Sequence, residues 1–312
     1  MIWVTWRQQR LEMLIASAVL ALVALFLLVT GLDMASTYRQ TGVAGCLGSQ
    51  DQACAPILDA FRHQFVPIIN IVGWFEFLPL LFGVLLAAPL ALELEQGTYR
   101  LAWTQSITRS RWITRKLAVV MCAAILIALT LTALVTWWRI PLDQLGSRFD
   151  PIGFDFEGTV PLAYTICAVA LGLAVGALVR RAIPAVAIAT VGFFALRVVI
   201  ELWARPHYLP PLVRAMATGR LHRSDWLLGE SYSDRFGHQL DLSALVQLCG
   251  SPIPGGMHIN PTCLRRHGII GVVTYQPADR FWLFQGIESA LFLGLAAGLL
   301  ALTVWWVRSR IA

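Results

Sequence analysis

The dominant pattern along the chain is an alternation of long apolar stretches with shorter polar segments. A helix that crosses the hydrocarbon core of a bilayer needs about 20 predominantly apolar residues. Six stretches reach that length, and each predicts one transmembrane helix. They span residues 13–32, 66–92, 117–138, 160–179, 182–204 and 281–307.

The first apolar stretch also resembles a secretory signal, because Arg7 and Arg10 precede it. Its apolar core is longer than that of a usual signal, and no convincing small-residue cleavage site follows, so we interpret it as a membrane anchor. Residues 1–12 place Trp3 and Trp6 beside the arginines. They predict an interfacial helix at the headgroups before the chain turns into the first span. The alternative is that residues 1–12 are only a basic, aromatic flank.

Composition supports an integral membrane protein. The chain is 57% hydrophobic and 13% charged, with a mean hydropathy of +0.67, whereas soluble domains carry about 25% charged residues. We therefore expect an all-α, multi-pass protein embedded in the lipid bilayer. The net charge is +6. In a membrane protein an excess of basic residues is explained first by their distribution between the two sides of the membrane, so nucleic acid is not the expected partner.

Basic residues are distributed unevenly between alternate connecting segments. Eleven lie in the amino end, in 93–116, in the turn 180–181 and in the tail, whereas 33–65 and 139–159 hold four. Short cytoplasmic loops are enriched in Lys and Arg, and long translocated loops such as 205–280 largely escape this rule. Both termini are therefore predicted to be cytoplasmic, in the plasma membrane.

Four of the six cysteines lie in segments predicted to be outside the cell. Cys46 and Cys54 lie in the first outer segment, and Cys249 and Cys263 in the last. Disulfides form on the oxidising side of the membrane, and four cysteines allow three pairings. We expect the two local pairs, Cys46 with Cys54 and Cys249 with Cys263. Four free thiols are the alternative.

Residues 205–280 form the one extramembrane segment long enough for structure of its own, and seven of the 15 prolines lie there. The pattern from Asp241 to Gly250 predicts a short amphipathic helix. The rest is expected to be proline-broken loops and short helices, too small for a separate core. We expect an extracellular cap packed on the outer ends of the spans.

Two spans carry small residues at every fourth position. The fourth span has Ala168, Gly172 and Gly176, and the sixth has Ala290, Gly294 and Gly298. Such faces let helices approach closely. Packing within the subunit and packing in a dimer both remain open.

Four ionisable residues interrupt the apolar spans: Glu76, Arg197, Glu201 and Glu288. A charge at bilayer depth costs about 3 kcal/mol on insertion scales, so each should face protein or water. Arg197 and Glu201 are four residues apart and can form an ion pair, structural or lining a pathway. Glu76, interpreted as nearer the middle of its span, is the stronger substrate-pathway candidate, and Trp74 and Phe77 flank it. Pro79 and Pro89 are expected to bend that helix.

Motifs for chemistry within this chain are missing from its sequence. A Walker loop ends in Gly-Lys-Ser/Thr, but the single lysine, Lys116, follows Arg115. No Gly-x-Ser-x-Gly or His-Glu-x-x-His motif occurs. His258, Cys263 and His267 match no zinc spacing that we can defend. We expect neither an enzyme nor a cofactor or metal site in this chain.

The segment 93–116, between the second and third spans, is far longer and more charged than a simple return requires. It reads Glu-x-Glu-x-Gly-Thr-x-Arg-Leu from Glu93, then Thr-Gln-Ser, then Arg-x-Arg-Trp ending at Trp112. This pattern resembles the corresponding segment of ABC-2 type (type V exporter) permease subunits, particularly actinobacterial ones. The sequences "WVTWRQQR" from Trp3 and "YQPADRFWLFQGIE" from Tyr275 are also similar to that family.

The resemblance implies that 93–116 contains a cytoplasmic coupling helix, over about 95–112, which docks on a separate ABC ATPase subunit. Gly97 would supply the turn before it. The implied coupling residues are Glu93, Glu95, Gly97, Thr98, Arg100, Arg109 and Arg111. The outer segment 205–280 is a departure from better-studied members and puts their substrate-exit geometry in doubt.

The resemblance further implies the permease subunit of an ATP-driven exporter, paired with a second permease chain, identical or related. ATP and Mg would be bound by the ATPase subunit. The aromatic-rich spans suit a hydrophobic or amphipathic substrate such as a drug, antibiotic, peptide or lipid. The alternative is a membrane sensor or assembly protein, with a ligand-binding cap and a cytoplasmic docking segment.

Overall fold

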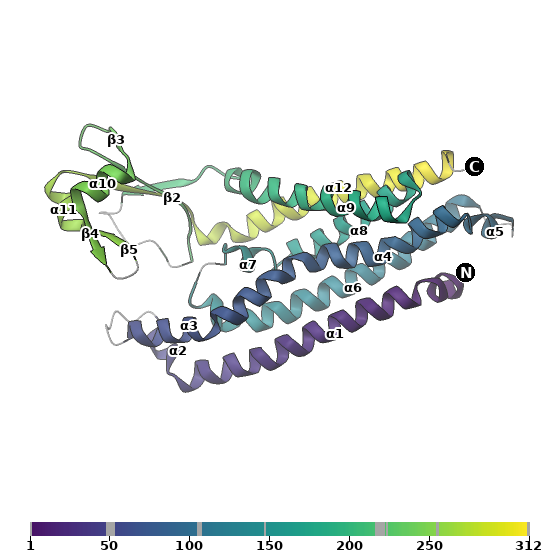
Figure 1. Cartoon of the computed structure of the whole chain (residues 1–312), viewed down its shortest axis with the longest axis horizontal. Helices are drawn as coiled ribbons and strands as arrows, with labels where there is room; N and C mark the ends of the chain where they lie inside the picture. The colour runs from purple at the N-terminus through teal and green to yellow at the C-terminus, as the bar shows by residue number, and fades with distance from the viewer. Residues whose placement is uncertain are drawn as a thin grey trace.

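The structure is an elongated helical bundle with a mixed α/β insertion at one end (Figure 1). This computed structural model describes residues 2–47, 54–104, 108–146, 148–215, 222, 224–253 and 256–310. Both termini lie at the end of the bundle that carries α5 (Tyr99–Thr104), opposite the insertion (Figure 1). That arrangement agrees with an even number of crossings.

Within the described residues, six helical segments are long and apolar enough to span a membrane. The fourth and fifth begin at the predicted residues, 160 and 182, and the others extend beyond their apolar stretches. The main helices are α1 (Ile2–Gln40), α3 (Cys54–Gly73) continued by α4 (Leu78–Gln96), α6 (Arg109–Asp143), α8 (Val160–Val179), α9 (Ala182–Val199) and α12 (Phe281–Ser309).

The amino end differs from the prediction of an interfacial helix that turns into the first span. Helix α1 is continuous over 39 residues, and nothing in the described chain separates residues 2–12 from 13–32. No proline or glycine lies near residue 12, so the backbone hydrogen bonds continue through the junction. Met1 and the side chains of residues 2–8, including Trp3 and Trp6, lie outside the described part.

The second span is broken at the position of Glu76. Helix α3 is followed by a 3-10 turn, η1 (Trp74–Phe77), before α4 begins with Pro79 in its first turn. Proline fits the first turn of a helix and ends the α-helical hydrogen bonding before it. The α-helical hydrogen bonding is therefore interrupted just before Pro79, whereas Pro89 lies inside the continuous α4.

Helix α8 is the central element of the bundle, packed against α4, α6, α9 and α12. Its contact with α4 is close because glycine and alanine alternate across it. A Cβ added at Gly172 would lie 2.7 Å from Ala87 Cβ, and one added at Gly83 would lie 2.8 Å from Ala168 Cβ. The small face of the fourth span therefore packs within the subunit.

The insertion corrects the expectation of an all-α protein with a loop-rich cap. An antiparallel sheet has the order β1 (Leu212–Ala215), β6 (Ile270–Gln276), β2 (Trp226–Ser233), β3 (Gln239–Leu240). A hairpin of β4 (Gly250–Ile253) and β5 (Gly256–Ile259) lies beside α10 (Leu242–Cys249) and α11 (Pro261–Arg266). The signal was present in β6, where Val273 and Tyr275 alternate with less buried residues. The expected helix near 241–250 is α10.

Both expected disulfides are formed. Cys46, at the end of α2 (Val43–Cys46), is bonded to Cys54, the first residue of α3, and Cys249 of α10 is bonded to Cys263 of α11. Both lie in the half of the molecule that carries the insertion. The local pairings follow from short separations of 8 and 14 residues.

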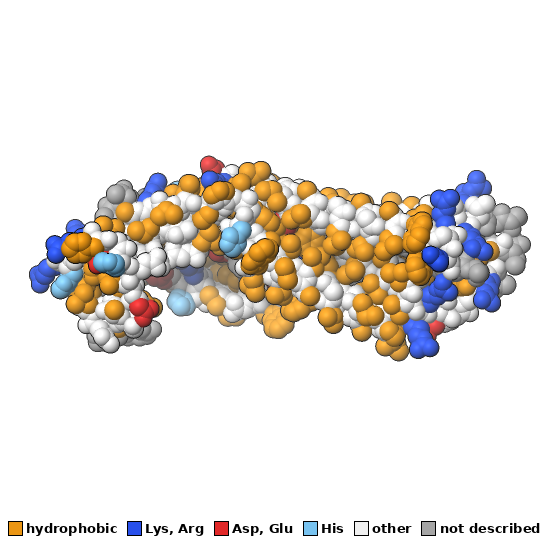
Figure 2. Space-filling view, turned by 90° about the horizontal axis from the view of Figure 1, so that it is seen from above, with side chains coloured by type: hydrophobic (Ala, Val, Ile, Leu, Met, Phe, Trp, Pro, Cys, Tyr) orange, Lys and Arg blue, Asp and Glu red, His pale blue; other side chains and the backbone are white. Residues whose placement is uncertain are grey.

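The surface is divided along the long axis. Figure 2 shows apolar side chains over the central body and a concentration of Lys and Arg at the end that holds the termini. On α1, Leu14, Leu22 and Leu25 are each at least 60% exposed. Such a continuous apolar surface suits contact with acyl chains rather than water.

Gly172 offers a test of the α4–α8 contact. Replacing Gly172 with Leu should destabilise the protein by about 1–3 kcal/mol, because the new side chain must displace α4. Gly294→Leu is the matched control, since a Cβ there meets nothing within 4 Å among the described residues. The measurement is the melting temperature in detergent by size-exclusion after heating. Equal losses for both variants would contradict the packing described.

The Cys249–Cys263 bridge is expected to protect the tip of the insertion. A membrane-impermeant maleimide should label these two cysteines only after reduction. By restricting the unfolded chain, a bridge that closes a loop of about 15 residues raises the free energy of unfolding by about 3 kcal/mol. Cys249→Ser together with Cys263→Ser should therefore increase proteolysis between the two positions. Mass spectrometry of labelled peptides provides the readout, and labelling of unreduced protein would contradict the bridge.

Candidate functional site

A cavity of about 230 Å³ lies between the start of α4 and the end of α9. It holds most of the predicted pathway residues, brought together from two spans more than 100 residues apart. The lining comprises Glu76, Phe77, Leu80, Phe193, Phe194, Arg197, Val198 and Glu201. Trp74 does not line it, but its ring lies 5.8 Å from that of Phe77 and its side chain is 71% exposed.

Both helices that form the cavity depart from α geometry there. The 3-10 turn η1 carries Glu76, and a π-helical turn, η2 (Ile200–Ala204), carries Glu201. Irregular helical turns change the direction of side chains and are frequent at functional positions. They aim two carboxylates at one space between the helices.

The register between α4 and α8 shows where the cavity lies along the axis of the bundle. The two helices run in the same direction, with Gly83 facing Ala168 and Gly176 facing Ala91. By this register Glu76 is level with the first residues of α8, at the end of the bundle nearer the insertion. Glu76 lies at the midpoint of the helical segment 56–96, because α3 extends the helix ten residues beyond the predicted boundary. Against the shorter α8, however, it is level with the first residues and not with the middle.

Arg197 forms its main ion pair with Asp155, a partner that the sequence did not suggest. Its Nη2 lies 2.9 Å from Asp155 Oδ2 and 4.0 Å from Glu201 Oε2. The guanidinium covers the ring of Tyr164 at 3.9 Å. Arg197 is only 9% exposed, and its Nη1 has no hydrogen-bond partner among the described residues.

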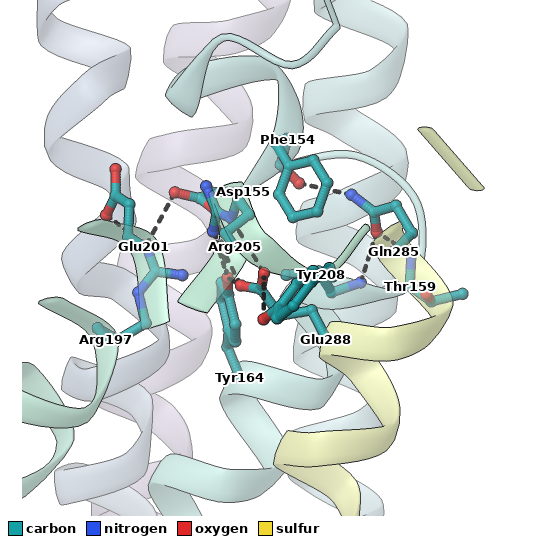
Figure 3. Close-up of polar contacts among 11 residues, drawn as sticks. Phe154, Asp155, Thr159, Tyr164, Arg197, Glu201, Arg205, Tyr208, Gln285 and Glu288 are labelled. Carbon is teal, nitrogen blue, oxygen red and sulfur yellow. Dashed lines mark hydrogen bonds and ion pairs between the residues drawn. The ribbon is translucent and has the colours of Figure 1, made fainter. Parts of the chain in front are cut away.

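Behind the cavity lies a buried polar network centred on Arg205, the first residue of the 3-10 turn η3 (Arg205–His207). Arg205 donates to Glu288 over 2.9 Å and 2.8 Å and to Asp155 over 2.6 Å (Figure 3). All three residues are at most 4% exposed. The Tyr164 hydroxyl contacts both carboxylates and has one proton to donate between them. Charges so placed need partners, and here each has one.

Tyr208 completes the network from the side of the insertion. Its hydroxyl lies 3.1 Å from Glu288 Oε2. Burial and the carboxylate of Glu288 raise the pKa of Tyr208 above its ordinary value. The phenol therefore stays protonated and donates to Glu288 throughout the physiological pH range.

A second polar cluster holds the loop that presents Asp155. Glu157 accepts from Arg139 at 2.9 Å and from Arg148 at 2.8 Å and 3.0 Å. Burial by itself would raise the pKa of Glu157, but its hydrogen bonds and the two arginine charges outweigh it and lower that pKa. Gln285 adds a clamp by accepting from the backbone N–H groups of Thr159 and Val160, at 3.1 Å and 3.0 Å.

Sequence reasoning identified Arg197, Glu201 and Glu288 as unusual charges but missed their partners. Asp155 and Arg205 lie outside the apolar stretches, so neither stood out as a charge in a membrane. Tyr164 and Tyr208 carry no formal charge and gave no signal. Asp155 and Glu288 are 133 positions apart, and only the packing of α8 against α12 brings them together.

At the opposite end, the predicted coupling residues fall into two groups. Glu93 and Lys116 form an ion pair between α4 and α6, and Glu93 is largely buried. Glu95 Oε2 accepts from the backbone N–H of Ala182 at 2.8 Å, at the start of α9. Gly97 ends α4 with φ of +71°, a conformation that favours glycine. These residues make contacts or a turn within the chain.

The remaining coupling residues are exposed. Thr98, Arg100, Arg109 and Arg111 lie on the surface around α5, and Arg109 covers the ring of Trp103 at 4.6 Å. Helix α5 has six residues, and Arg109 and Arg111 belong to the first turn of α6, after Thr108 as its N-cap. A single helix over 95–112 is therefore not what the described residues form, because Gly97 and Thr108 end and begin helices. Residues 105–107 lie outside the described part.

His258, Cys263 and His267, for which the sequence predicted no metal site, include one residue that cannot act as a thiolate ligand. The sulfur of Cys263 is in the disulfide with Cys249, so it offers no thiolate. The side chain of His258 lies outside the described residues.

The Arg205 network yields a direct test. Glu288→Gln should lower stability by about 3–5 kcal/mol, because it leaves two buried guanidinium groups, those of Arg205 and Arg197, to share the single carboxylate of Asp155. Glu201→Gln is the control, since its pair with Arg197 is long and its side chain is 28% exposed. The measurement is thermal unfolding in detergent. A smaller loss for Glu288→Gln than for Glu201→Gln would contradict the role of the network.

Comparison with known proteins identifies a family for most of the helical bundle. A family model described as ABC-2 membrane transporter related matches residues 17–205, more than half of the chain. The match covers most of the first span, the next four spans, the α5 segment and the cavity, and stops where the insertion begins. No curated protein and no solved structure matches the chain. The chain belongs to the ABC-2 membrane transporter related family.

Proposed function

We propose that this chain is the transmembrane permease subunit of an ATP-driven exporter whose ATPase is a separate polypeptide. The observation that carries the proposal is the construction of the α5 end. There the exposed residues Arg100, Arg109 and Arg111 surround a short helix that is joined to several spans, in a chain that belongs to a membrane transporter family. ATP and Mg are bound by the partner subunit.

The ties at this end suit the transmission of movement. Glu95 connects the end of α4 to the start of α9, and Glu93 connects α4 to α6. Trp103 packs edge-on against Trp112 at 6.1 Å, joining α5 to α6. A displacement of α5 by a docked ATPase therefore moves three spans together, which is how a local contact produces a rigid-body rearrangement.

The docking surface that we propose consists of exposed groups around α5, namely Thr98, Arg100, Arg109 and Arg111. Glu93, Glu95 and Gly97 support it from within. The topology that follows places both termini and α5 in the cytoplasm, and both disulfides on the oxidising outer side of the plasma membrane.

The substrate pathway that we propose includes the cavity of Glu76, Phe77, Arg197 and Glu201, with Trp74 on its outer flank. Exposed aromatic rings beside carboxylates suit a hydrophobic or amphipathic substrate. The transport cycle requires a second permease subunit, identical or related, because the pathway of such a transporter forms between two chains. ATP binding to the ATPase pair favours one conformation, and weaker substrate binding in the outward state allows release.

Charge reversal at α5 tests this proposal. A tagged chain purified from native membranes should retain an ATPase subunit, and Arg100→Glu with Arg111→Glu should reduce that retention at least tenfold. The control is Arg265→Glu with Arg266→Glu, an equal change of charge at exposed positions of the insertion. Expression and detergent stability should match the wild type in both variants.

Two outcomes would overturn the proposal. Retention of the ATPase by the α5 variant would remove the docking role. Copurification of a cytoplasmic partner without nucleotide hydrolysis would favour the sensor or assembly protein instead.

A further inference from the structure

We propose that the cavity between α4 and α9 binds organic cations, specifically an ammonium group carried on an apolar body. The inference rests on the proposed function, in that it names the substrate class of the same site. Its basis is the arrangement of charges, aromatic rings and exposed surface at this one place.

The charges around the cavity do not balance. The carboxylates of Asp155, Glu288, Glu201 and Glu76 face two guanidinium groups, those of Arg197 and Arg205. Arg205 is engaged by Asp155 and Glu288, and Arg197 is held mainly by Asp155. The surplus of negative charge therefore lies on the cavity side, on Glu76 and Glu201.

Glu76 has the stronger need of a partner. It makes no hydrogen bond or ion pair within the described part of the chain, and it lines the cavity. Glu201 has only the 4.0 Å contact with Arg197. Arg197 also lines the cavity, but its charge is neutralised by Asp155. A positive ligand between η1 and η2 would therefore meet a net negative charge from Glu76 and Glu201, which disfavours an anionic ligand.

The aromatic lining matches the same ligand class. The rings of Phe77 and Phe194 stack at 6.4 Å with an interplanar angle of 16°, and both border the cavity. Aromatic faces attract cations, and ammonium ligands are bound in this way. Arg197 contributes a buried Nη1 without a described partner, which offers a donor to an acceptor atom of the ligand or to water.

The cavity is large enough to enclose only part of the ligand. Ligand pockets for drug-sized molecules hold about 300–1,000 Å³, more than the 230 Å³ found here. The cavity therefore accommodates a cationic head and an adjoining ring. The remaining apolar body would lie along the exposed flank formed by Phe194 and Trp74, in contact with acyl chains or a second permease chain.

The same chemistry is available from two sources, a free amphiphilic cation and the ammonium headgroup of a lipid. Both present a cation at the level of the outer end of α8, with an apolar body beside it. The experiment below separates the two by lipid composition.

Equilibrium dialysis of radiolabelled benzyltrimethylammonium, against the full chain in phosphatidylglycerol nanodiscs, tests the inference. Binding should be saturable, and neopentylbenzene, its neutral isostere, should not compete. Glu76→Gln should weaken binding at least tenfold. Glu230→Gln, the same change at an exposed position of the insertion, should have no effect.

A folding control separates charge recognition from structure. Glu76 is exposed in the isolated chain and has no described partner, so Glu76→Gln should keep the wild-type melting temperature. Binding should weaken while stability does not. Wild-type affinity in Glu76→Gln, or competition by neopentylbenzene at the same concentration as unlabelled benzyltrimethylammonium, would overturn the inference.

The lipid arm uses nanodiscs of phosphatidylcholine, which supply an ammonium headgroup. Loss of probe binding there identifies a lipid headgroup as the ligand, and unchanged binding identifies a free cation; either result keeps the ligand class. The assay requires neither ATPase nor transport. Failure to bind the cation while the ATPase is retained refutes only the ligand class, and cation binding without a retained ATPase refutes only the exporter.

Discussion

The architecture depends on one buried interaction, the ion pairs that Asp155 and Glu288 form with the guanidinium of Arg205. These groups come from the loop before α8, the first turns of α12, and η3, which follows α9 and η2. A charge removed from water is tolerated only when its partners are positioned in advance. The network therefore fixes three elements relative to one another, and any rearrangement of α9 against α8 must keep it intact or exchange its partners.

Two features of the molecule follow from this constraint. Arg197 reaches Asp155 from α9, so the rear of the cavity is held at the same carboxylate that binds Arg205. The insertion is fixed as well, since Tyr208 joins the network and Trp226 stacks on Phe149 at 5.5 Å. The cavity between α4 and α9 and the insertion are thus both held by the Arg205 network, whereas the α5 end is built from a separate set of contacts around Glu93 and Glu95.

The close contact of α4 with α8 links these two ends. Glycine and alanine allow the helices to approach along their length, from Gly83 to Gly176, so they behave as one stiff body. The irregular turns η1 and η2 lie just beyond this contact. Conformational freedom is therefore expected where the cavity is, at the end of a rigid pair of helices that starts at the proposed docking surface.

The sequence by itself determined the spans, the local disulfides and the odd charges at Glu76, Arg197 and Glu288. These properties depend on residues close together in the chain: about 20 apolar residues form a span wherever they occur, and Cys46 needs only a short loop to reach Cys54. Long-range pairing and strand order were decided by the tertiary structure. Arg205 finds Glu288 only when α9, α8 and α12 pack together, and β6 becomes a central strand only when β1 and β2 reach it from earlier in the chain. A buried ion pair depends on the distance between two atoms in space, and that distance is set by how helices far apart in sequence pack.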